Sequence, residues 1–87
     1  MATSISLTPP ACRGGKVCTT VFNDGNDSAT VTVTFDVGGK TYQCTVTVPP
    51  KSAKDCCVTP AETGLCDVTV SAPGATPQSV RLFLPCR

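Results

Sequence analysis

The sequence predicts an all-β protein, a sandwich of two antiparallel sheets with about seven short strands. Apolar and polar residues alternate along several runs, which is the period of a strand with one buried face. Clusters of Pro or Gly separate these runs at fairly regular spacing. The chain has 87 residues and seven cysteines. A single small domain of this size needs additional stabilisation, and disulfides would provide it.

The clearest strand is expected at residues 30–37. Valine or Phe35 occupies every second position, and Thr or Asp occupies the positions between. We therefore expect one face in the core and the other in solvent. Gly38-Gly39 predicts a tight turn, because glycine adopts positive φ without strain. A second alternating strand is expected at 40–48, before a Pro-Pro pair.

The remaining strands are expected on both sides of this hairpin. Residues 66–71 and 80–84 alternate, a further strand is expected at 16–22, and 4–7 and 51–58 are weaker candidates. Pro and Gly punctuate residues 1–14, which are predicted to form an extended N-terminal arm. Residues 15–87 would form the sandwich domain, and we expect it to stay folded when residues 1–12 are deleted.

Composition disfavours several classes of function. The net charge is +1 and 15% of residues are charged, so neither a nucleic-acid footprint nor a disordered chain is expected. No apolar run approaches the roughly 20 residues of a membrane span. The chain has no His, hence no Ser-His or Cys-His pair, and we expect no enzyme and no cofactor. The carboxylates form no catalytic motif and are expected on solvated faces: Asp24, Asp27, Asp36, Asp55, Glu62 and Asp67.

The cysteines indicate a disulfide framework. None of their spacings is the short C-x2-C knuckle that zinc favours, so no metal site is expected. Disulfides indicate an extracellular or cell-surface location. The first ten residues do not form a signal peptide, so a removed signal or another export route is expected. The framework comprises Cys12, Cys18, Cys44, Cys56, Cys57, Cys66 and Cys86.

The adjacent pair Cys56-Cys57, termed the doublet below, must point to opposite faces if it lies in a strand. Cys44 and Cys66 are in phase with apolar residues and are expected inward, whereas the direction of Cys18 is ambiguous. Seven is odd, so one sulfur is left for a bond between chains or as a free thiol. The sequence leaves the pairing open. The candidates for linking chains are Cys12, Cys86 and one member of the doublet.

The loop at residues 23–28, NDGNDS, admits two interpretations. Its oxygen side chains allow a calcium loop, but the spacing lacks the EF-hand pattern, and a turn is favoured. Asn26-Asp27-Ser28 is also an N-glycosylation sequon, so a glycan is a candidate modification at Asn26. The Thr rows at 30–36 and 41–47 allow binding to ice or a crystal face, but an ordinary outward face is favoured.

Five features follow one another in a recognisable order. They are an Asn-x-Gly loop at 23–25, a strand at 30–37, a hairpin at 38–39, a Pro-containing turn with Ser at 48–52, and a glycine before an alternating strand at 64–70. Across residues 16–72 this order resembles the immunoglobulin-like modules of the CARDB type from bacterial and archaeal surface proteins. The resemblance implies an immunoglobulin-like sandwich that serves as a surface or secreted binding or spacer module. The chain departs from those modules in its seven cysteines, and we expect it to stand alone rather than in a tandem array.

The arm and the odd cysteine predict a structural subunit. We expect a non-enzymatic extracellular protein that assembles with its own copies into a fibre or surface layer through the arm and disulfides. The alternative is a stand-alone secreted binding module, such as an inhibitor, toxin or effector, whose disulfides only stabilise the fold. In that case an exposed loop at 49–54 or 60–64 would engage the target.

Overall fold

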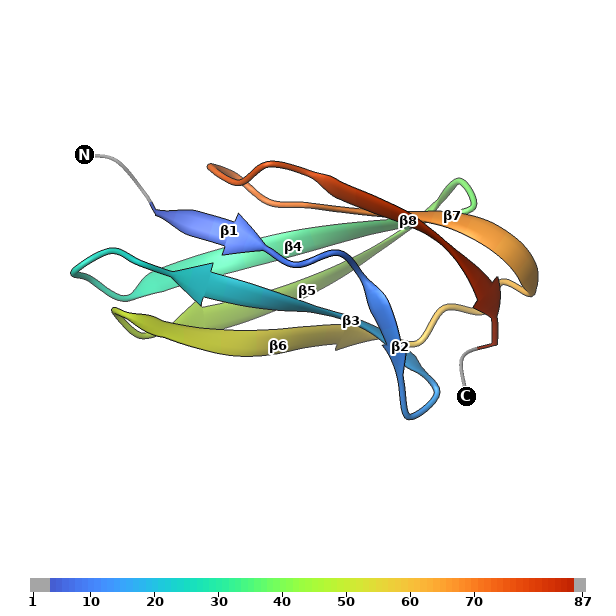
Figure 1. Cartoon of the computed structure of the whole chain (residues 1–87), viewed down its shortest axis with the longest axis horizontal. Coiled ribbons are helices and arrows are strands. Elements are labelled where there is room, and N and C mark those ends of the chain that lie inside the picture. Colours follow the sequence, from blue (N-terminus) through green and yellow to red (C-terminus); the bar gives the residue numbers. More distant parts are fainter. Residues whose placement is uncertain (1–3, 86–87) are drawn as a thin grey trace.

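A computed structural model of the chain describes residues 4–85, in which eight strands form two antiparallel sheets (Figure 1). The all-β class and the two antiparallel sheets are confirmed, and the described residues contain no helix. The strands are β1 (Ile5–Leu7), β2 (Ala11–Arg13), β3 (Lys16–Asn23), β4 (Ala29–Val37), β5 (Lys40–Val48), β6 (Ser52–Val58), β7 (Gly64–Ser71) and β8 (Gln78–Leu84).

The first sheet, sheet A, is built around β3. Strand β6 pairs with β3 along its whole length, from Val17 to Asn23 of β3. Strands β1 and β2 pair with the two ends of β3, at residues 21–23 and 16–18 respectively. They therefore lie one after the other along the edge that β6 leaves open. Residues 8–10 separate them, so eight strands are present where about seven are expected.

The segment expected as an N-terminal arm is built into sheet A. Ile5 and Leu7 are each only 6% exposed and belong to the hydrophobic core. Between β1 and β2, the Thr20 backbone N–H donates to Thr8 Oγ1 at 2.9 Å, and Thr19 Oγ1 donates to the Thr8 carbonyl. The Pro-Pro pair lacks N–H donors and interrupts the ladder without releasing the chain from the sheet. The described residues of this segment thus belong to the sandwich.

The second sheet, sheet B, has the order β5-β4-β7-β8. Gly38 and Gly39 make the β4–β5 turn with φ of 57° and 93°, as expected for a turn that only glycine enters easily. Strand β4 pairs with β7 only through residues 34–37. The β4–β5 and β7–β8 hairpins are therefore staggered, and the molecule is elongated, at 40 × 21 × 16 Å.

The core lies between the two sheets and follows the predicted alternation. Phe35 is its largest fully buried side chain. The inward phases predicted for residues 30–37, 40–48, 66–71 and 80–84 are confirmed, because those positions are buried or half-buried and their neighbours are more exposed. Besides Phe35, Ile5 and Leu7, the buried apolar residues are Val17, Cys18, Val21, Val31, Val33, Val37, Val48, Cys56, Val68, Val70 and Leu84.

Candidate functional site

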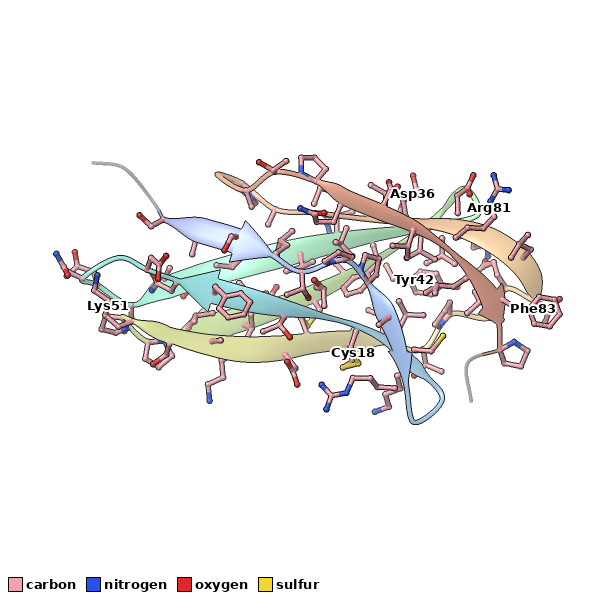
Figure 2. The ribbon with its side chains drawn as sticks, in the orientation of Figure 1. Cys18, Asp36, Tyr42, Lys51, Arg81 and Phe83 are labelled. Atoms are coloured by element: carbon pink, nitrogen blue, oxygen red, sulfur yellow. A yellow bond between two sulfur atoms is a disulfide. The ribbon has the colours of Figure 1, made fainter. Side chains whose placement is uncertain are left out.

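The cysteine doublet forms two disulfides, one on each face of β6, and each links β6 to another strand. Cys56 is buried and forms a disulfide with Cys44, which joins the edge strands β5 and β6 of the two sheets. Cys57 is exposed and forms a disulfide with Cys18, its register partner on β3 (Cys18 is labelled in Figure 2). The opposite facing of the two sulfurs is confirmed. The expectation that one of them links to another chain is not confirmed, because both form disulfides within this chain. The register places Cys18 directly opposite Cys57.

The free thiol among the described residues is Cys66. It lies half-buried on β7, in phase with core residues as predicted. Its Sγ donates weakly to the Thr63 carbonyl at 3.9 Å. Cys12 is disulfide-bonded, and Cys86 lies outside the described residues. The unpaired sulfur of the described part therefore faces the core, in a place poorly suited to joining chains.

Tyr42 fixes the loop between β6 and β7. Its hydroxyl donates to Glu62 Oε1 at 2.8 Å and accepts the Ala61 backbone N–H at 3.1 Å. The side chain is half-buried against the core (Figure 2). The inward direction of Tyr42 was predictable from the alternation. These contacts were not, since the partners lie 19 and 20 residues away in the sequence.

The loop at 23–28 is organised by the buried side chain of Asn23. Its Nδ2 donates to the carbonyls of Asp27 at 2.8 Å and Val48 at 3.0 Å, and its Oδ1 accepts the Gly25 N–H at 2.9 Å. An asparagine that bonds the backbone two residues on is typical of a turn, the interpretation favoured above. Asn26 is exposed in this loop, so the sequon is accessible to a glycosylating enzyme and the glycan stays a prediction.

Four carboxylates take part in contacts that hold the fold. Asp55 on β6 accepts hydrogen bonds from Arg13 at 3.0 Å and Thr20 at 2.8 Å, and so joins three strands of sheet A. Asp36 accepts the Gly39 N–H at the β4–β5 turn. Glu62 holds Tyr42, and Asp67 holds Arg81. These contacts account for four of the six acidic side chains without any catalytic assignment.

Threonine and serine hydroxyls pair across the outer face of sheet B. Thr32 and Thr45 lie 3.1 Å apart, and Thr69 and Ser79 lie 2.6 Å apart. A third pair, between Thr30 and Thr47, has its oxygens 3.3 Å apart. Cross-strand Thr pairs are the ordinary way in which an outward face stabilises a sheet. The hydroxyl rows are therefore explained by the fold itself.

An apolar pair interrupts this polar face at one end. Leu65 and Phe83 are register partners on β7 and β8, and they are 63% and 72% exposed. Phe83 points away from the body of the sandwich (Figure 2). The next pair on the same face is Asp67 and Arg81, with Oδ1 and Nε 2.9 Å apart. The hydrogen bond and the charge of Asp67 raise the pKa of Arg81. This surface therefore carries two exposed apolar side chains next to an ion pair of one positive and one negative charge.

The edges of the two sheets differ in how they are protected against pairing with another chain. β1 and β2 are three residues each and are separated by prolines, which protects that edge. The disulfide between Cys44 and Cys56 brings the β5 and β6 edges together. By contrast, β8 has seven residues, pairs with β7 without a bulge and contains no proline. Within residues 4–85, no strand pairs with its outer side.

Other types of site find no support in the described part of the chain. Residues 4–85 contain no group of three His, Cys, Asp or Glu side chains placed to hold a metal ion. They also contain no helix long and apolar enough to span a membrane. Comparison with protein-family models, curated proteins and solved structures found no match to this chain. We therefore infer its function from its own geometry.

Proposed function

We propose that the protein is a non-enzymatic extracellular structural subunit that associates with further copies of itself. The observation that carries this proposal is the open β8 edge beside Leu65 and Phe83. Sheet proteins normally protect a long, regular edge strand, because its unpaired backbone groups are a template for another strand. Large apolar side chains that are exposed next to each other mark a surface that a partner covers.

We assign the fold to the immunoglobulin-like class. Strands β1/β2, β3 and β6 take the places of strands A, B and E. Strands β5, β4, β7 and β8 take the places of C′, C, F and G in the facing sheet. This order supports the immunoglobulin-like part of the resemblance to CARDB-type modules, which implies a surface or secreted binding or spacer module.

The disulfides support the extracellular location of this proposal. Two of them join described residues, and both lie within one chain of only 87 residues. Disulfides persist in oxidising compartments and are rare in the reducing cytosol. In this proposal they stabilise each subunit, while contacts between subunits are non-covalent. The arm and the doublet, which the sequence indicated as linkers, are both engaged within their own chain.

Two measurements on the oxidised 87-residue chain test self-association. A denaturing gel run after thiol blocking should show one band near 8.9 kDa with and without reductant. Light scattering on the native protein should show a mass that rises with concentration above that of one chain. A native mass equal to one chain at every concentration would count against a self-assembling subunit.

The alternative, a stand-alone binding module, is favoured by one observation. Tyr42 holds the loop at residues 59–63 through Glu62 and Ala61, so this surface loop is preorganised. A preorganised loop binds a target with less loss of conformational entropy. This function predicts a monomer in the light-scattering measurement and loss of target binding when Tyr42 is changed to Phe. The self-assembling subunit predicts neither result.

A further inference from the structure

We propose that β8 pairs antiparallel with β8 of a second copy, about a two-fold axis that passes through Leu82 perpendicular to sheet B. The pairing would join two four-stranded sheets into one continuous sheet of eight strands. It rests on the self-association proposed above and names the interface that produces it. The partner is a second copy of this chain, and the interface is the outer edge of β8.

The two-fold axis restricts which residues can face each other. An axis perpendicular to the sheet keeps the outer face of both copies on the same side. Centred on Leu82, it places Arg81 opposite Phe83 of the second copy on the outer face, twice. On the inner face it places Val80 opposite Leu84, so the two apolar cores become neighbours. A guanidinium stacks favourably on an aromatic ring, and the Phe83 ring leaves solvent in the process.

Neighbouring registers are less favourable. An axis through Arg81 would place two guanidinium groups opposite each other, and like charges at such positions destabilise a sheet. An axis through Val80 would pair residues 78–82 and leave Phe83 beyond them, opposite Pro77, which has no N–H for the ladder. An axis through Phe83 would leave only a short overlap, because β8 ends at Leu84. The Leu82 register pairs residues 80–84, so it keeps Phe83 inside the paired segment and sets no like charges opposite each other. Its proline, Pro85, lies opposite Ser79 only beyond that segment.

The second copy also fits the charge of this surface. An isologous interface must be complementary to itself, so it needs both signs of charge or neither. Asp67 and Arg81 supply one of each sign next to Leu65 and Phe83. A partner of strong single-sign charge would gain nothing from such a balanced surface. The register, the apolar pair and the charge balance therefore indicate the same occupant.

Two substitutions at one exposed position test the register. Phe83→Lys places a cation opposite Arg81 of the second copy and should weaken dimerisation about tenfold or more, whereas Phe83→Glu places a carboxylate there and should retain it. Phe22→Lys is the matched control, because Phe22 is 41% exposed on the outer face of the other sheet and should not affect dimerisation. Sedimentation equilibrium gives the dissociation constants, and circular dichroism checks that each variant is folded.

The outcomes separate this inference from the proposed function. If Phe83→Lys weakens dimerisation and Phe83→Glu does not, the Leu82 register is supported. Equal weakening by Lys and Glu overturns the register, and self-association that neither substitution changes overturns the β8 interface while the structural function stands. A wild-type chain that stays monomeric from micromolar to millimolar concentration overturns both.

Discussion

At the scale of one residue, Phe35 shows how the alternation of apolar and polar residues along a strand places a side chain in the core, where its burial stabilises the fold. It sits in the middle of an alternating run, and its side chain is completely buried between the sheets. Its neighbours Thr34 and Asp36 face the other side of β4 and are more exposed. The phase was predictable because the side-chain direction in a strand depends only on position along that strand.

Phe35→Asp should unfold the domain, because it removes a large apolar side chain and buries an unpaired charge. Circular dichroism and the dispersion of amide signals in NMR would detect the loss. Thr30→Asp is the control, since Thr30 is exposed on the same strand and a carboxylate there stays hydrated. A folded Phe35→Asp protein would mean that the phase of β4 is wrong.

At the scale of elements, the disulfides decide which strands stay together. The bond between Cys44 and Cys56 joins two sheets and spans 12 residues of sequence, whereas the bond between Cys18 and Cys57 lies within sheet A and spans 39. A cross-link that closes a longer loop removes more entropy from the unfolded chain. The two bonds therefore differ in where they act and in how much they stabilise.

Replacing both members of each pair by Ala should lower the free energy of unfolding by different amounts. Chain entropy gives about 4 kcal/mol for the Cys18–Cys57 bond and about 3 kcal/mol for the Cys44–Cys56 bond. Urea denaturation of the two double variants under oxidising conditions measures the difference. If the Cys44–Cys56 variant loses more, its packing in the core outweighs the effect of loop length.

At the scale of the whole molecule, the N-terminal strands complete the sandwich. Ile5 and Leu7 cover the same core as Val21 and Val33, although they lie at the start of the chain. Proline-rich composition indicated an arm, yet the short alternation at β1 outweighs it, because Ile5 and Leu7 gain burial against β3. The described residues of this segment are thus needed to complete the folded sandwich rather than to form a free arm.

Deleting residues 1–12 should therefore destabilise or unfold the monomer. It removes β1, two buried apolar side chains and the disulfide-bonded Cys12. Two buried Leu-sized side chains alone contribute about 3–6 kcal/mol. Thermal denaturation followed by circular dichroism checks this. An unchanged melting temperature would show that residues 1–12 are dispensable for the fold.

The sequence by itself determined the class of fold and the facing of most strands. Period-two alternation is a local property, so Phe35, Tyr42 and Cys66 were assigned correctly to the inner face without knowledge of any neighbour. The opposite facing of Cys56 and Cys57 follows from the same rule.

Only the tertiary structure decided which strands are neighbours and in which register. The bond between Cys18 and Cys57, the contact of Tyr42 with Glu62 and the pairing of Leu65 with Phe83 all depend on that choice. Alternation gives each strand a face but no partner, because many strands of the same period are interchangeable along the sequence. The packing of the two sheets removes this ambiguity and leaves β8 as the open edge.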